Sequence, residues 1–149
     1  MSPPAGESAR WLRPFRRPAL WCAGWAVLFA LVATGSLLPA SDVPSMPVPG
    51  LDKLQHFLGY AALSAYGVML FGRMRPQALA AALVVAFGIG VEWAQGALTA
   101  DRNPEAADAM ANALGALAGL LLASTPVARG LQRLDARLFP RQPPSAPDA

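Results

Sequence analysis

The chain has 149 residues, of which 54% are hydrophobic and only 14% are charged, with a formal net charge of +3. So few charged positions exclude an ordinary soluble helical bundle, because its helices could not present polar outer faces. The single cysteine, Cys22, excludes an internal disulfide and a metal site built on cysteines.

Four apolar stretches are long enough to cross a hydrocarbon core, which takes about 20 residues per helix. They run over residues 18–38, 54–71, 77–98 and 106–124. We therefore predict an all-α fold, an integral membrane bundle of four transmembrane helices. This domain, residues 18–125, would lie between a disordered basic segment, 1–17, and a C-terminal region, 126–149.

The first span could instead be a cleaved signal peptide, since basic residues precede it. Its apolar run, 19–38, is longer than the usual 7–15 residues and lacks a clear small-x-small cleavage site, so we expect an uncleaved helix. Trp11, Trp21 and Trp25 lie toward its cytoplasmic half and are expected to anchor it among the headgroups. Cys22 is expected to be a small packing residue.

A proline-rich loop follows at 39–50 and leads into the second span. Asp52 could cap that helix, because its carboxylate can accept from unpaired backbone N–H groups. A tight turn at 73–76 makes the second and third spans antiparallel neighbours. A second loop, 98–104, precedes the fourth span.

The region after Pro126 contains a basic amphipathic segment, 129–139, with three leucines on one face and an arginine every four residues. This pattern favours a helix lying on the anionic inner leaflet, or a short solvated helix. The Pro-rich residues 140–149 are predicted to be disordered.

The basic residues are distributed unevenly across this topology. Ten of the twelve fall on one side, namely Arg10, Arg13, Arg16, Arg17, Arg73, Arg75, Arg129, Arg133, Arg137 and Arg141. The positive-inside rule then places both termini of this multi-pass protein in the cytoplasm. The basic excess is thus a topology signal, and we expect no nucleic-acid partner.

Polar residues gather at the opposite, outer ends of the predicted helices. Helical spacing puts Asp52, His56 and Tyr60 on one face, and likewise pairs Glu92 with Gln95 and Asp108 with Asn112. Because charge within a bilayer segment costs free energy, it usually marks a functional site. The predicted binding layer consists of Asp52, Lys53, His56, Tyr60, Glu92, Gln95, Arg102, Asp108 and Asn112.

Glu92 could pair with Arg102 or hydrogen-bond to His56 or Tyr60, and the alternative is a purely structural ion pair. His56 could act as a general base, but Ser64 is a poor nucleophile candidate, so no catalytic residue is assigned and an enzyme is disfavoured.

A metal site of His56, Glu92 and Asp108 is conceivable, but one histidine without cysteine does not suffice to assign one, and no cofactor is predicted. Lys53 and Arg102 could hold an anionic headgroup or only neutralise the nearby carboxylates. Gly115 and Gly119, four residues apart, predict close helix packing in a tight bundle.

These residues, in this order, resemble the VanZ-like family of small bacterial membrane proteins. The matching pieces, over about residues 50–122, are Asp52-Lys53-x-x-His56-x-x-x-Tyr60, Glu92-x-x-Gln95, Arg102 and Asp108-x-x-x-Asn112-x-x-Gly115-x-x-x-Gly119. The stretch 99–107 is shorter than in many members. The resemblance implies an integral, multi-pass protein of the bacterial inner membrane, within the cell envelope. The founding member is linked to teicoplanin resistance, a glycopeptide phenotype that the motifs alone do not carry over to this chain.

The leading hypothesis is an outward-facing pocket that binds a polar or anionic envelope molecule, such as a membrane lipid headgroup or a cell-wall precursor. The alternatives are an enzyme acting on such a precursor, a small transporter, and a scaffold in which the polar layer only locks the helices.

Overall fold

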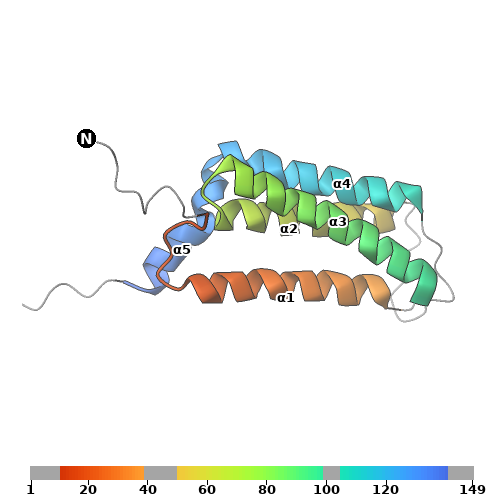
Figure 1. The fold of residues 1–149 in the computed structure, drawn as a ribbon, viewed down its shortest axis with the longest axis horizontal. Coiled ribbons are helices and arrows are strands. Elements are labelled where there is room, and N and C mark those ends of the chain that lie inside the picture. Colours follow the sequence, from red (N-terminus) through yellow and green to blue (C-terminus); the bar gives the residue numbers. More distant parts are fainter. Residues whose placement is uncertain (1–10, 39–49, 99–104, 141–149) are drawn as a thin grey trace, which may run out of the picture.

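The computed structural model describes residues 11–38, 50–98 and 105–140, and this part of the chain contains helices and no strand. Its elements are α1 (Pro18–Leu37), α2 (Leu51–Leu70), α3 (Met74–Leu98), α4 (Ala106–Leu121), the 3₁₀ helices η2 (Leu122–Ser124) and η3 (Pro126–Arg129), and α5 (Gly130–Leu138). Helices α1 to α4 lie lengthwise beside one another and alternate in direction, while α5 lies at one end (Figure 1). The all-α class is confirmed.

Three of the described helical segments are long and apolar enough to cross a membrane: Pro18–Leu37, Met74–Leu98 and Ala106–Ser124. Helix α2 is not among them, although its 20 residues match α1 in length. Large apolar side chains such as Leu31, Ile89 and Leu114 are exposed on the outside of the bundle. Hydrocarbon would solvate such a surface, so these features indicate a membrane protein.

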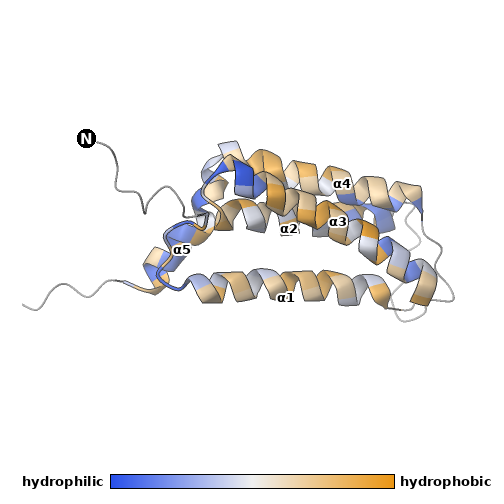
Figure 2. Cartoon of the chain, viewed as in Figure 1, coloured by the Kyte–Doolittle hydropathy of each residue, from blue (hydrophilic) through white to orange (hydrophobic). Residues whose placement is uncertain are grey.

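Colouring by hydropathy separates the middle of the bundle from its ends (Figure 2). Every arginine that the structure describes lies near where α1 and α3 begin and α2 and α4 end, or on α5 beside them. We call this the arginine-rich end. At the other end, the polar end, α2 and α4 begin with Asp52, Lys53 and Asp108.

Helices α2 and α4 form the most extensive contact in the bundle. Gly115 and Gly119 lie at its centre and face the backbone of α2. A Cβ atom added to Gly115 would lie 2.3 Å from the carbonyl oxygen of Phe57, and one added to Gly119 would lie 2.5 Å from that of Ala61. Only glycine permits the two backbones to approach this closely.

The core lies between α2, α3 and α4, where Tyr60, Leu63, Val84 and Ala116 are buried. Helix α1 joins it through aromatic rings in edge-to-face contact. The centroids of Trp25 and Phe29 are 5.1 Å apart, and those of Phe29 and Phe87 are 4.8 Å apart. The indole of Trp25 also donates a hydrogen bond to the carbonyl of Leu63 at 2.9 Å.

Helix α2 begins at Leu51, three residues before the predicted start of the second span. Its N-cap is Gly50, whose φ of 79° favours glycine, and no side chain caps it. Asp52 therefore lies within the first turn, and its predicted role as cap is wrong.

Helix α5 packs on the arginine-rich end instead of leaving its whole apolar face for a leaflet. Leu131 packs against Trp21 and Leu70. Asp135, one turn further, is 1% exposed and accepts hydrogen bonds from the backbone N–H groups of Arg16 at 2.6 Å and Arg17 at 3.2 Å.

The indole Nε1 of Trp21 also donates to Asp135, at 2.8 Å. Burial by itself would raise the pKa of Asp135, but these hydrogen bonds outweigh burial and hold the pKa below its ordinary value. Trp21 is thus buried against α5, so its predicted role as a headgroup anchor is wrong. Cys22 is exposed, which contradicts its predicted packing role.

Residues 11–17, within the segment predicted to be disordered, are fixed to the end of α2. The N–H of Arg13 donates to the carbonyl of Leu70 at 2.9 Å, and the N–H of Gly72 donates to that of Trp11 at 3.0 Å. The predicted loops at 39–49 and 99–104 and the predicted disorder of 1–10 and 141–149 lie outside the described residues.

Candidate functional site

Four polar side chains from α2, α3 and α4 converge near the polar end of the bundle. Nδ1 of His56 lies 3.1 Å from Oδ1 of Asn112 and 3.8 Å from Oε1 of Glu92. Nδ2 of Asn112 donates to the same Glu92 oxygen at 3.4 Å. Asp108 lies one turn before Asn112 on α4 and joins them. We call His56, Glu92, Asp108 and Asn112 the polar cluster.

The polar cluster is enclosed but incompletely paired. The side chains of His56 and Glu92 are only 10% and 9% exposed. Oδ1 of Asp108 has the Lys53 ammonium at 3.4 Å as an ion-pair partner, whereas Oε2 of Glu92 is buried with no hydrogen-bond partner among the described residues. Buried oxygens of this kind cost free energy until a donor, a cation or water reaches them.

The cluster has the composition of a divalent-cation site. Ligand atoms of His56, Glu92 and Asp108 all lie within 4.8 Å of one another. An ion bonded at about 2.0–2.2 Å would draw them slightly closer. An imidazole with two carboxylates suits Zn²⁺, Mn²⁺ or Fe²⁺.

Tyr60 lies one turn further along α2 than His56, and the two rings are stacked with centroids 6.5 Å apart. The residue is 1% exposed, and its hydroxyl has no hydrogen-bond partner among the described residues. Ser64, another turn along, is also buried, and its hydroxyl has no hydrogen-bond partner within the described ranges, but it lies against Gly119 of α4. Ser64 is therefore a packing residue.

Lys53 lies at the start of α2, where it pairs with carboxylates from both helices. Its Nζ is 2.9 Å from Asp52, 3.0 Å from Glu105 and 3.4 Å from Asp108. The first two pairs are largely exposed and contribute little stability. Lys53 thus neutralises the acidic start of α4, while Arg102, the other predicted cation, lies outside the described residues.

The hydrogen bond of Gln95 connects it to α1 and not to the polar cluster. Its Nε2 donates to the carbonyl of Ser36 on α1 at 2.7 Å, and the residue is 4% exposed. Gln95 therefore fastens the end of α1 to α3.

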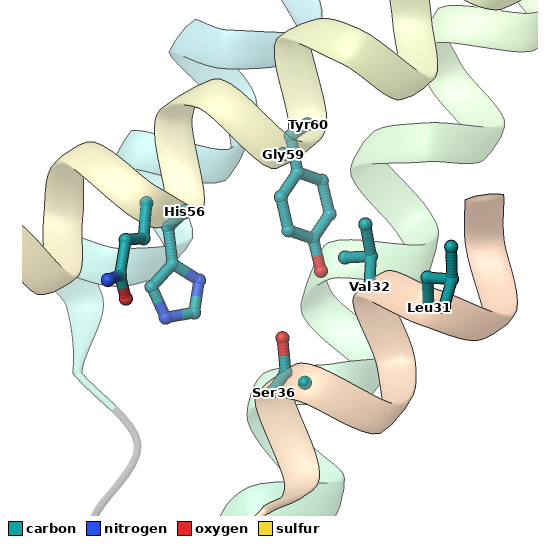
Figure 3. A pocket seen from close by; sticks show the side chains of 8 residues that line it. Leu31, Val32, Ser36, His56, Gly59 and Tyr60 are labelled. Carbon is teal, nitrogen blue, oxygen red and sulfur yellow. The ribbon is translucent and has the colours of Figure 1, made fainter. Parts of the chain in front are cut away.

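A groove of about 230 Å³ runs between α1 and α2 beside the cluster. Helix α1 contributes Leu31, Val32, Gly35 and Ser36, and helix α2 contributes Gln55, His56, Gly59 and Tyr60. The hydroxyls of Tyr60 and Ser36 point toward one another across this space, with the His56 ring beside them (Figure 3).

His56 belongs to both the groove and the polar cluster, so it connects them. The contribution of α1 was missed in the sequence, where the polar Ser36 near the end of an apolar span was the only signal.

Comparisons of the chain with models of protein families, with curated proteins and with solved structures found no match. The functional argument therefore depends on this geometry. It offers an imidazole, one buried and one partly buried carboxylate, and a phenol, beside a groove with one apolar wall.

Proposed function

We propose that the chain is a VanZ-like, four-span protein of the bacterial inner membrane that binds a polar or anionic envelope molecule, such as a lipid headgroup. Both termini would be cytoplasmic, because the described arginines gather at the end where α1 begins. Helix α2 would be the fourth span, since it packs along the other three and turns Tyr60 and Ser64 inward.

The observation that carries the proposal is the composition of the groove between α1 and α2. Leu31 and Val32 form an apolar wall, Ser36 and His56 supply polar atoms beside it, and the buried hydroxyl of Tyr60 points into the same space (Figure 3). A lipid has the same division between chain and headgroup. The unpartnered hydroxyl of Tyr60 would gain a hydrogen bond from such a ligand.

Filling the groove tests this proposal directly. A Cβ atom on Gly35 would meet nothing within 4 Å, so Gly35→Leu places a side chain in the groove without striking the backbone. Gly90 on α3 is equally unobstructed but lies outside the groove, which makes Gly90→Leu the matched control.

Native mass spectrometry of the detergent-purified proteins should show a copurified lipid or precursor on wild type and on the Gly90 variant. The Gly35 variant should have lost it. Glu92→Gln should weaken binding without unfolding the bundle, and a metal adduct lost in that variant would reveal a cation in the polar cluster. Equal, nonspecific lipid on all four proteins would refute ligand binding and favour the scaffold function.

A further inference from the structure

The arginine-rich end contains a second cavity, of about 480 Å³, at the opposite end of the bundle from the groove. Three arginines from separate segments line it. Arg13 comes from the residues before α1, Arg129 from the end of η3 and Arg133 from α5.

Backbone hydrogen bonds and helix packing position the segments that carry these arginines. The N–H of Arg13 is bonded to the end of α2, at 2.9 Å from the carbonyl oxygen of Leu70. Arg129 is the N-cap of α5 and Arg133 lies in the first turn of that helix, so the start of α5 carries both. Leu131 and Asp135 hold the helix against α1 and α2.

The positive charge in this cavity is not balanced by its described surroundings. No acidic residue lines it, and no described carboxylate forms an ion pair with Arg13, Arg129 or Arg133. Nε of Arg13 is buried, and no atom in the described part of the chain forms a hydrogen bond with it. Burial, and secondly the charge of Arg129, lower the pKa of Arg13.

The other polar side chains that line the cavity donate hydrogen bonds to backbone carbonyls near the ends of helices. Nε2 of Gln77 donates to the carbonyls of Val68 at 3.1 Å and Phe71 at 2.9 Å. The hydroxyls of Ser124 and Thr125 donate to carbonyls three residues back. The guanidinium groups of the three arginines are therefore the donors available to a ligand in this cavity.

We propose that this cavity binds a phosphate group, carried either by an anionic lipid of the adjacent leaflet or by a free phosphate compound. The planar guanidinium matches phosphate oxygens through two parallel N–H groups. Basic pockets between membrane helices commonly hold phosphate headgroups. This site is separate from the groove, so neither proposal depends on the other.

The test compares Arg13→Gln and Arg129→Gln with Arg75→Gln. Arg75 is exposed at the same end but does not line the cavity, so its variant removes the same charge as a matched control. The purified full chain is incubated with cardiolipin or with phosphatidylcholine and analysed by native mass spectrometry. Inorganic phosphate is titrated separately by calorimetry.

Wild type should prefer cardiolipin, and each cavity variant should lose about tenfold in affinity, the usual value of one charge-assisted contact. Arg75→Gln should stay within about twofold of wild type. Circular dichroism verifies folding, and Arg13→Lys, which keeps the charge without the planar fork, should bind with intermediate affinity.

Binding of cardiolipin alone identifies the leaflet as the source, and saturable binding of inorganic phosphate identifies a free compound. Equal losses in the cavity variants and in Arg75→Gln would overturn the site and leave only diffuse attraction to charge. Absence of binding to either probe would overturn it as well.

Discussion

Replacing Gly115 with alanine should force α2 and α4 apart. The new Cβ would lie 2.3 Å from the carbonyl oxygen of Phe57 and 3.1 Å from the backbone N of Ala61. Both obstacles are backbone atoms, so no side-chain rotation can relieve the contact. The helices would have to separate by about 1 Å to restore an ordinary contact distance.

The expected cost follows from two opposing effects. Alanine in place of glycine favours a helix by about 1 kcal/mol. Overpacking a tight contact costs about 1–3 kcal/mol, and the separation also weakens the contacts along the rest of the seam. These two effects together give a net loss of about 0–2 kcal/mol, to which the weakened seam adds a further loss. The 3.1 Å contact between His56 and Asn112, which crosses the same two helices, should lengthen.

Gly90→Ala is the matched control, because Gly90 is helical and its Cβ would meet nothing within 4 Å. Thermal and SDS denaturation of the purified proteins should show Gly115→Ala destabilised and Gly90→Ala unchanged or slightly stabilised. Equal stability of the two variants would refute the close approach of α2 and α4.

Three further changes separate structural from binding roles. Asp135→Asn should cost about 2–4 kcal/mol at neutral pH, because the buried carboxylate accepts three hydrogen bonds. The pKa of Asp135 is lowered in the fold, so its carboxylate stabilises the fold above the unfolded pKa of about 4. This stabilisation is lost as pH falls from there through the folded pKa, so the melting temperatures of wild type and Asp135→Asn should converge at low pH. A difference in melting temperature that does not change with pH would contradict this prediction. Gln95→Leu should lower the free energy of unfolding by about 1–2 kcal/mol, because it removes the hydrogen bond to Ser36. Hydrogen exchange should increase at the Ser36 end of α1 but not at the start of that helix. A uniform increase along α1 would argue against a role of Gln95 in holding the end of α1. Tyr60→Phe should leave stability unchanged or raise it by about 1 kcal/mol, because the buried hydroxyl has no hydrogen-bond partner among the described residues. The same variant should retain less lipid in native mass spectra. Retention equal to wild type would show that Tyr60 does not belong to the binding site.

The sequence determined the helical class and most helix bounds, because apolar runs of membrane length allow few other structures. The predicted first span differs from α1 by one residue at its end, the third span ends with α3 but starts three residues after it, and the fourth span matches α4 and η2 together. Helical spacing also placed polar residues of three helices toward the same outer end, with His56, Gln95 and Asn112 within about two turns of it and Tyr60 and Glu92 slightly deeper, because the period of a helix is fixed by its backbone.

Only the tertiary structure showed how those residues face one another across helices. The sequence did not show that Gln95 turns to α1, because three-residue spacing on one helix does not say which neighbour each side chain meets. It also did not reveal the contribution of Ser36 to the groove. These contacts depend on the rotation of each helix about its axis, which is set by packing such as that of Gly115 against Phe57.

Asp135 shows most clearly which contacts only the tertiary structure decides. In the sequence it is one charged residue in a short basic segment, where a solvated side chain is the ordinary expectation. In the fold it is buried and holds the start of α1, because residues 114 or more positions apart bring their N–H groups to one carboxylate. Local pattern determines which segments become helices, whereas the pairing of distant polar groups is decided only when those helices pack.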